Sequence, residues 1–307
     1  MKSQINAQCL ILLYERLCQW LLIETHSRSL STSAQYPEDS MAVPEPQKEL
    51  LEKILGSLKT DDRLLGVAIG GSYLSGEMDE YSDLDLIIVV DNVHYEQVLK
   101  ERQFLASKLG KLLVAFTGEH VGEPRLLICL YDSPLIHVDL KFLLLQDFQT
   151  DRVENPIILW ERGNLLTLAV SDNPRNYPPF DPQWIEDRFW VWVHYGATKL
   201  GRGELFEVID FLSFLRGQVL APLAKVQAGL LPRGVRNLEM EIPSYLNDFR
   251  QTIPTKHDQE EIARSLQHTI RLYCHLRSTL TMPELIIRSQ AEAASTKYLE
   301  KVIDDLK

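Results

Sequence analysis

Two aspartates one residue apart, Asp83 and Asp85, open an apolar run that ends at Val90. Side chains on a strand alternate between its two faces, so this spacing predicts that both carboxylates point the same way. Carboxylates held this close repel each other unless a cation lies between them, and Mg²⁺ bound by carboxylates and substrate phosphates is a common solution. The pair therefore predicts a divalent-metal site, with a solvated strand entrance as the simpler alternative.

A Gly-Gly-Ser turn lies upstream of the aspartates and follows an apolar segment at residues 64–69. Gly71 lets the backbone approach a phosphate closely. Ser72 supplies a hydroxyl where the next residues predict a short helix with its positive end outward. Such a turn is common by itself, but it becomes specific when an aspartate pair follows it. We expect Gly71 and Ser72 to contact phosphate.

A third polar group lies in the segment LIHVDLKFLLL, where His137, Asp139 and Lys141 alternate with apolar residues. The alternation predicts a strand with one polar face. Asp139 is a candidate to join the metal pair or to accept a proton from an attacking hydroxyl, and Lys141 is a candidate to neutralise phosphate. We expect His137 to be a rim residue or a satisfied polar residue rather than a ligand. An ordinary amphipathic edge strand would show the same pattern.

The segment GGSYLSGEMDEYSDLDLIIVV, with the later lone aspartate, resembles the nucleotidyltransferase signature of the DNA polymerase beta superfamily. The resemblance covers residues 64–145. It implies that a nucleoside monophosphate passes from a nucleoside triphosphate, expected to be ATP, to an acceptor hydroxyl while pyrophosphate leaves. It also implies two Mg²⁺ ions. The residues assigned by position are Gly71, Ser72 and Lys141 for the triphosphate, and Asp83, Asp85 and Asp139 for metal binding and catalysis.

The segment FWVWVHYGATKLGRGELFEVIDFLSFLRGQVL is similar to the helical domain of bacterial aminoglycoside adenylyltransferases and lincosamide nucleotidyltransferases. The similarity implies that Lys199 contacts the triphosphate and that Glu204 binds a cationic acceptor or helps to deprotonate it. Arg202 would contact phosphate or pair with Glu204. The implied acceptor is a small molecule, with an aminoglycoside-like antibiotic as one candidate. The general base is left open between Asp139 and Glu204, and a solvated helix end is the simpler reading of these residues.

The elements that position these residues follow from apolar spacing. We expect an α+β fold, in which a small mixed β-sheet with packed helices is followed by a C-terminal helical bundle. The last two strands are expected to form an antiparallel hairpin. The expected strands are 64–69, 82–90, 112–116, 125–131 and 136–145, and the expected helices are 47–61, 94–110, 184–203, 205–230, 257–280 and 283–306.

Composition changes along the chain predict three parts. Residues 1–45 are expected to be an N-terminal amphipathic helix and a Ser, Thr and Pro-rich linker arm, because the apolar run near the start is too short and too charged to span a membrane. Residues 46–172 form the expected nucleotidyltransferase domain. A proline-rich stretch then separates it from a helical bundle domain at residues 173–307.

The overall composition limits the kinds of molecule that the protein is expected to bind. A chain of 307 residues with a formal net charge of −11 has room for two domains and no large basic surface, which argues against long nucleic acids. Its 4 cysteines are scattered, without the close pairs of a zinc site, so a reducing cytoplasm is expected. We expect a cytoplasmic monomer or homodimer that uses a nucleoside triphosphate and a small-molecule acceptor, with no membrane partner.

Two other functions remain open from the sequence. A glycosyltransferase also holds a metal with an aspartate pair, but it would leave the Gly-Gly-Ser turn and Asp139 without roles. A protein-modifying, antitoxin-like protein or a nucleotide-binding regulator would use the same domain differently. Pyrophosphate release with a small acceptor distinguishes the enzyme from a regulator.

Overall fold

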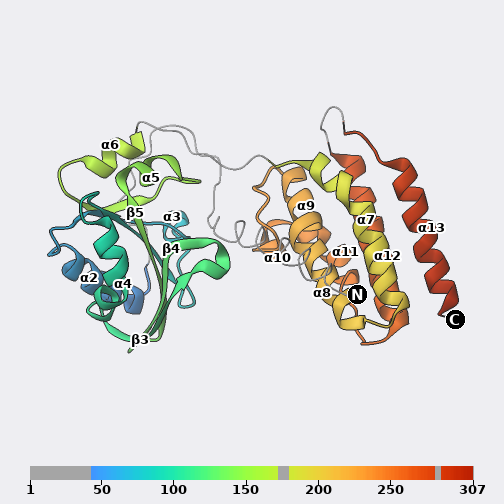
Figure 1. Cartoon of the computed structure of the whole chain (residues 1–307), viewed down its shortest axis with the longest axis horizontal. Helices are drawn as coiled ribbons and strands as arrows, with labels where there is room; N and C mark the ends of the chain where they lie inside the picture. Colours follow the sequence, from blue (N-terminus) through green and yellow to red (C-terminus); the bar gives the residue numbers. More distant parts are fainter. Residues whose placement is uncertain (1–42, 172–179, 281–284, 307) are drawn as a thin grey trace, which may run out of the picture. The chain divides into compact units, whose positions relative to one another are not determined.

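The computed structural model describes residues 43–171, 180–280 and 285–306 (Figure 1). The chain divides into two compact units, with the division in the sequence after Pro178. Each unit has its own core and is described by itself. The helix and linker predicted before residue 43 lie outside the described residues.

The first unit is built around a sheet of six strands in the order β3-β4-β5-β2-β1-β6. Neighbouring strands are antiparallel except for β2 and β5, which are parallel. The strands are β1 (Leu64–Ile69), β2 (Leu84–Val90), β3 (Lys111–Gly118), β4 (Glu123–Asp132), β5 (Ile136–Leu144) and β6 (Ile157–Glu161). The helices are α2 (Glu45–Leu58), α3 (Ser72–Ser75), α4 (Tyr95–Ser107), the 3₁₀ turn η1 (Glu119–Val121), α5 (Leu145–Thr150) and α6 (Leu165–Ser171).

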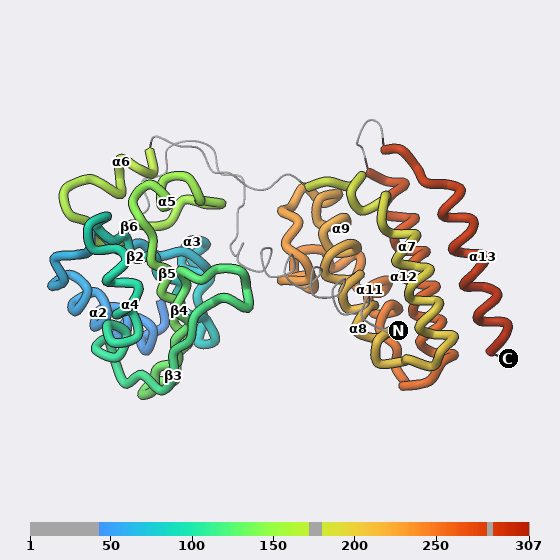
Figure 2. Tube along the Cα trace, in the orientation of Figure 1, coloured from blue at the N-terminus to red at the C-terminus, as the bar shows by residue number. Residues whose placement is uncertain are grey.

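Alternate residues of the central strands enter two different apolar clusters, one on each face of the sheet. Leu84, Leu86 and their even-numbered neighbours pack with α2 and α4. Val89 and Leu143 pack on the other face with α5 and α6. Figure 2 shows these two pairs of helices over different parts of the sheet. Side chains at odd positions of β2 and β5 therefore lie on the α5 and α6 side, where part of the face is left uncovered.

The expected mixed sheet followed by a helical region is confirmed, with differences in detail. β2 begins at Leu84 rather than at residue 82, so Asp83 lies just before the strand and not within it. Several elements of this unit were not predicted, among them β6, α5, α6 and the short turn η1. β6 is short and each of its residues is only partly buried, so it carries no apolar alternation that a sequence pattern could reveal.

The second unit is helical, and its principal helices are shown at the right of Figure 1. Helices α7 and α13 make the most extensive contact between helices in it. Its elements are α7 (Pro182–Gly201), α8 (Leu205–Leu215), the π-helical turn η2 (Arg216–Leu220), α9 (Ala221–Gln227), α10 (Leu238–Glu241), the 3₁₀ turn η3 (Pro243–Tyr245), α11 (Leu246–Gln251), α12 (Gln259–Thr279) and α13 (Ser289–Asp305). Of these, α10, η3 and α11 were not predicted.

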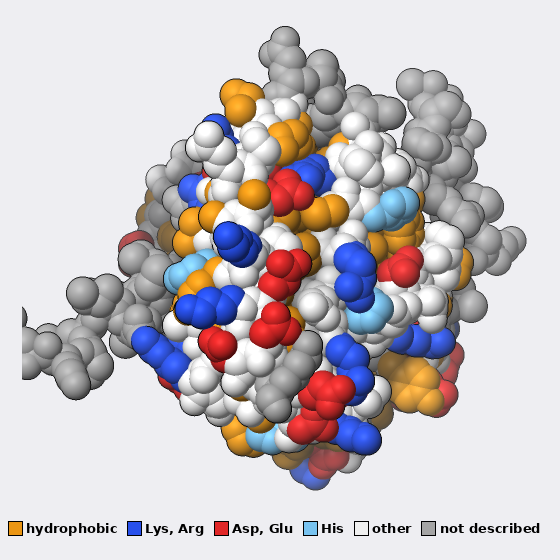
Figure 3. All heavy atoms as spheres, turned by 90° about the vertical axis from the view of Figure 1, so that its right-hand side faces the viewer, with side chains coloured by type: hydrophobic (Ala, Val, Ile, Leu, Met, Phe, Trp, Pro, Cys, Tyr) orange, Lys and Arg blue, Asp and Glu red, His pale blue; other side chains and the backbone are white. Residues whose placement is uncertain are grey.

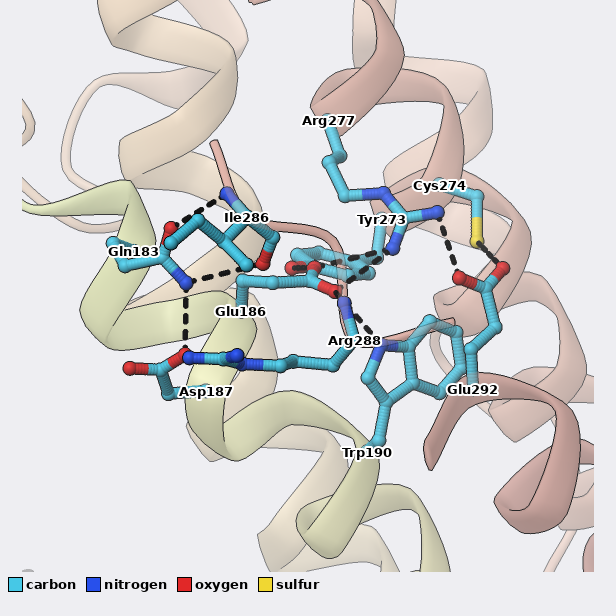
Figure 4. Close-up of polar contacts among 10 residues, drawn as sticks. All are labelled: Gln183, Glu186, Asp187, Trp190, Tyr273, Cys274, Arg277, Ile286, Arg288 and Glu292. Atoms are coloured by element: carbon cyan, nitrogen blue, oxygen red, sulfur yellow. Dashed lines mark hydrogen bonds and ion pairs between the residues drawn. The ribbon is translucent and has the colours of Figure 1, made fainter. Parts of the chain in front are cut away.

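A buried polar network around Glu186 joins three segments of this unit (Figure 4). Glu186 on α7 is completely buried, and it accepts hydrogen bonds from Tyr273, Trp190 and the backbone N–H of Arg288. Nη1 of Arg277 lies 3.1 Å from Oε2 of the same carboxylate. A buried charge is tolerated only when it is paired and fully hydrogen bonded, and this network meets that condition.

Two predicted helices in this unit differ from the structure, one in where it starts and one in its regularity. The helix predicted over 283–306 starts only at Ser289, because the backbone N–H groups of Ile286 and Arg288 donate to side chains on α7 instead of to preceding carbonyls. The helix predicted over 205–230 contains a π-helical turn at Arg216–Leu220. Pro222 follows this turn and has no N–H to continue an ordinary α-helical ladder.

In the ranges that the structure describes, no helix combines the length and the apolar composition needed to cross a bilayer. The face of the helical unit drawn in Figure 3, on the side of α13, mixes positive and negative side chains. Such a face has no single-sign field that would attract a highly charged polymer.

Candidate active site

Asp85 and Asp139 are register partners on the parallel strands β2 and β5. Partners on neighbouring strands project to the same face of a sheet, and the strands are about 4.7–4.9 Å apart. The polar row predicted on β5 therefore lies beside the aspartate pair. The fold brings together Asp83, Asp85 and Asp139, although the third residue is far from the other two in the sequence.

The Gly-Gly-Ser turn lies directly against this carboxylate group. The N–H of Gly70 donates to the backbone oxygen of Asp85 over 2.9 Å. Gly71 has φ 67° and ψ −153°, a conformation that only glycine adopts readily. A Cβ on Gly71 would lie 1.9 Å from Oδ2 of Asp85. Glycine is thus required here both by backbone conformation and by space, and Ser72 follows as the first residue of α3.

His137 lies between two of the three aspartates, a position that sequence reasoning missed. Its Nε2 is 2.9 Å from Oδ1 of Asp139, and its Nδ1 is 3.9 Å from Oδ2 of Asp83. The hydrogen bond to Asp139 raises the pKa of His137 against the opposing effect of burial, and the charges of Asp139, Asp83 and Asp85 add to the rise. A positive charge is therefore favoured among these three carboxylates.

A fourth carboxylate approaches the turn from the loop before β6. Oε1 of Glu154 lies 3.6 Å from the position that a Cβ on Gly70 would take. No sequence pattern singled out this residue, because it lies in an irregular loop. Within the described ranges, no group of three or more His, Cys, Asp or Glu side chains is arranged so that it could hold a metal ion as it stands.

Lys141 shares the face of Asp139 but is engaged in an ion pair. Its Nζ lies 3.0 Å from Oε2 of Glu123, a residue of β4 that is almost fully buried. Nε of Arg125 lies 2.6 Å from the other oxygen of Glu123. Burial raises the pKa of Glu123, but the hydrogen bonds and charges of Arg125 and Lys141 outweigh it and lower the pKa to about 2.

The remaining predicted residues, Lys199, Arg202 and Glu204, lie together in the second unit. Nζ of Lys199 is buried 2.6 Å from Oε2 of Glu204. Nη1 of Arg202 is 3.8 Å from the other oxygen of Glu204. Sequence reasoning missed two members of the group: Glu207, 2.8 Å from Nζ of Lys199, and Tyr195, which donates to Glu207. Their helical spacing from Lys199 and Glu204 was the available signal.

Burial and hydrogen bonding shift the pKa values of Lys199 and Tyr195 in this second cluster. Burial lowers the pKa of Lys199, but its hydrogen bonds to Glu204 and Glu207 reverse the effect and raise the pKa. Burial and the hydrogen bond to Glu207 raise the pKa of Tyr195 to about 12. The cluster therefore keeps Lys199 charged, with two carboxylates within ion-pair distance of it.

Residues 51–122 match the family described as a nucleotidyltransferase domain. The range includes the Gly-Gly-Ser turn, Asp83 and Asp85, and it ends before Asp139. The match confirms the predicted resemblance and supports a transferase role for the chain. No curated protein matches the sequence closely enough to be compared with it.

Three solved structures are similar to the chain at low identity. A nucleotidyltransferase-like protein from Exiguobacterium sibiricum 255-15 is 13% identical over 84% of this chain and 80% of its own, with a TM-score of 0.32. The STING-associated CdnE c-di-GMP synthase from Capnocytophaga granulosa is 16% identical over 76% and 82%, with a TM-score of 0.28. Spectinomycin adenyltransferase AAD(9) from Enterococcus faecialis, solved with ATP and spectinomycin, is 15% identical over 83% and 98%, with a TM-score of 0.23. These scores support no statement about substrate.

Proposed function

We propose, from the nucleotidyltransferase domain matched at residues 51–122, that this protein transfers a nucleoside monophosphate from a nucleoside triphosphate to the hydroxyl of a small acceptor. The observation that carries the proposal is the register pairing of Asp85 with Asp139, with Gly71 against the carboxylate of Asp85. In this arrangement the turn that we expect to contact phosphate lies beside the carboxylates, on one face of the sheet. ATP is the nucleotide that we expect.

The donor side of the reaction is assigned to the turn and the aspartates. Only a glycine at position 71 leaves the carboxylate of Asp85 accessible, and carboxylate oxygens are the ligands that Mg²⁺ prefers. Asp83, Asp85 and Asp139 would hold Mg²⁺, two ions in our proposal. When bound, such ions supply positive charge to the phosphates and lower the pKa of the acceptor hydroxyl. Gly71 and Ser72 would donate hydrogen bonds to the triphosphate.

The acceptor side is assigned to Asp139 as general base. In the proposed transfer, the acceptor oxygen attacks the α-phosphorus, the bond from this phosphorus to the bridging oxygen of pyrophosphate breaks, and the hydroxyl proton goes to a carboxylate oxygen of Asp139. Asp139 is accessible in part, as a base that meets a substrate must be. Lys141, held beside Asp139 by Glu123, would add positive charge near the phosphates.

In the helical unit we propose that Lys199 contacts the triphosphate and that Arg202 and Glu204 bind the acceptor. Glu204 is already paired with both Lys199 and Arg202. We assign the general base to Asp139 because it lies in register with Asp85, on the sheet face where the metal and the phosphates are proposed to bind.

Pyrophosphate release with purified full-length protein tests the proposal. ATP, GTP, CTP and UTP with Mg²⁺ are offered with a panel of acceptors that includes aminoglycosides, lincosamides and apolar alcohols. We expect acceptor-dependent release that disappears with EDTA and in Asp85→Asn, while circular dichroism shows that the variant keeps its fold. Nucleotide binding without release for any acceptor would overturn the proposal in favour of a regulatory role.

A further inference from the structure

Four apolar side chains form a partly exposed platform on β3 and β4, the edge strand at one end of the sheet and its neighbour. Val114 and Phe116 on β3 are register partners of Leu130 and Ile128 on β4, respectively. Val114 is 50% exposed and Phe116 is 46% exposed, whereas Ile128 and Leu130 are half-buried. The solvent-facing side of an antiparallel sheet normally carries polar residues. An apolar surface at this place therefore indicates that something binds to it.

The apolar platform continues the row of the candidate active site without a break. Ile128 is the register partner of Asp139, and Leu130 is the register partner of His137. A single cross-strand row thus runs from Asp85 through Asp139 and Ile128 to Phe116. With strands about 4.7–4.9 Å apart, Phe116 lies about 10 Å from Asp139 along the sheet.

Two carboxylates at the borders of the platform are paired with cations. Asp132 is bound by Lys111, and Glu123 is bound by Arg125 and Lys141. The platform itself carries no charge. At its outer end the ring of His120 lies 5.6 Å from the ring of Phe116 and extends the aromatic surface. The four uncharged platform side chains offer no charge to a polycation, whereas a flat apolar body would cover those that are exposed.

We propose that the platform formed by Val114, Phe116, Ile128 and Leu130 binds the body of the acceptor while its hydroxyl lies at Asp139. This assignment rests on the proposed function and narrows it. The acceptor is then a hydroxylated molecule with a flat apolar face that reaches about two strand spacings, or about 10 Å, rather than a polycation. Aminoglycosides are therefore expected to be poor acceptors compared with alcohols that carry fused rings.

The test uses 2-(2-naphthyl)ethanol as a fluorescent probe that combines a flat apolar body with one hydroxyl. Its binding to the full-length protein is measured in the presence of Mg²⁺ and a non-hydrolysable ATP analogue. Phe116→Ser and Val114→Ser should weaken the probe about tenfold, as expected when apolar contact is removed from a binding site. Phe104→Ser is the control, because Phe104 is also an exposed phenylalanine (62% against 46% for Phe116) but lies on α4, which packs on the opposite face of the sheet.

Equal probe affinity in wild type, Phe116→Ser and Phe104→Ser would overturn the platform assignment. Acceptance of kanamycin with a KM that Phe116→Ser leaves unchanged would overturn it as well. So would a change in oligomeric state caused by Phe116→Ser, because the platform would then be an interface between two copies. Affinity for the ATP analogue, measured separately, should be the same in all three proteins. Failure of the proposed function would give a different result from failure of the platform assignment, namely undiminished pyrophosphate release in Asp85→Asn.

Discussion

The carboxylate of Asp85 fills the space that any side chain on Gly71 would need, with 1.9 Å between Oδ2 and the ideal Cβ position. The two residues are therefore coupled: the turn can keep its shape only if residue 71 has no side chain. This coupling places the turn that we propose to bind phosphate against the carboxylate half of the motif.

Gly71→Ala is expected to destabilise the turn and displace Asp85. The backbone conformation alone costs of order 1–3 kcal/mol for a residue with a Cβ, and the clash adds to it. We expect loss of detectable transfer and weaker nucleotide binding by titration calorimetry. Gly163→Ala is the control, because Gly163 also has a positive φ of 62° but no atom lies within 4 Å of its Cβ position. Full activity in Gly71→Ala would contradict the assigned role of the turn.

Asp139→Asn and Glu204→Gln separate the two candidates for the general base. Removal of a general base typically lowers a rate about 10²–10⁴-fold. We expect a loss of this size in kcat for Asp139→Asn, and a far smaller loss for Glu204→Gln. Steady-state kinetics at saturating nucleotide measures both. The reverse order of effects would move the base to the helical unit.

Lys141→Met tests whether this lysine serves the nucleotide as well as its ion pair. The change leaves the buried carboxylate of Glu123 with Arg125 as its remaining close cation, which should cost about 1–3 kcal/mol of stability. If Lys141 also contacts phosphate, the KM for the nucleotide should rise several-fold with little change in the acceptor KM. Glu123→Gln provides the comparison, because it disturbs the same pair but keeps the lysine. A thermal shift in Lys141→Met with an unchanged nucleotide KM would assign Lys141 to structure alone.

Glu186 should make the helical unit sensitive to acid. Burial raises its pKa, but the hydrogen bonds from Tyr273, from the Arg288 backbone and from Arg277 hold the pKa below the ordinary 4.5. The stability that this lowered pKa contributes is present above pH 4.5 and is lost as the pH falls through the folded-state value.

The corresponding experiment compares wild type with Glu186→Gln by hydrogen exchange of α7 and α12 amides. Breaking a buried ion pair costs about 3–5 kcal/mol at neutral pH, and this difference should shrink as the pH is lowered below 4.5. Glu292→Gln is the control, because Glu292 binds the same Arg277 but is partly exposed. A difference that does not vary with pH would exclude Glu186 as the titrating group.

Sequence patterns were sufficient to predict the elements whose structure is determined by a local signal. The Gly-Gly-Ser turn, β1 and the apolar part of β2 follow from short-range spacing, and the structure has them close to the predicted positions. The pairing of Asp85 with Asp139 is different in kind. It depends on which strands become neighbours, and periodicity within one segment carries no information about that choice.

Other features depend on contacts between distant segments. Asp83 approaches His137 from another segment, and the strand of His137 gives no sign of this approach. The start of α13 was placed too early because side chains of α7, distant in sequence, take the hydrogen bonds of Ile286 and Arg288. In both cases a tertiary contact decided the outcome.

The parallel pairing of β2 with β5 has a consequence for the order in which the protein folds. Between these neighbours the chain passes through α4, β3 and β4, so the central pair closes only after a long crossover has formed. Non-local closure of this kind is entropically costly and slow compared with hairpin or helix formation. Residues 51–122, which carry the matched motif, do not include Asp139. We therefore expect the proposed centre to be complete only after the hairpin of β4 and β5 has paired with β2 and placed Asp139 beside Asp85.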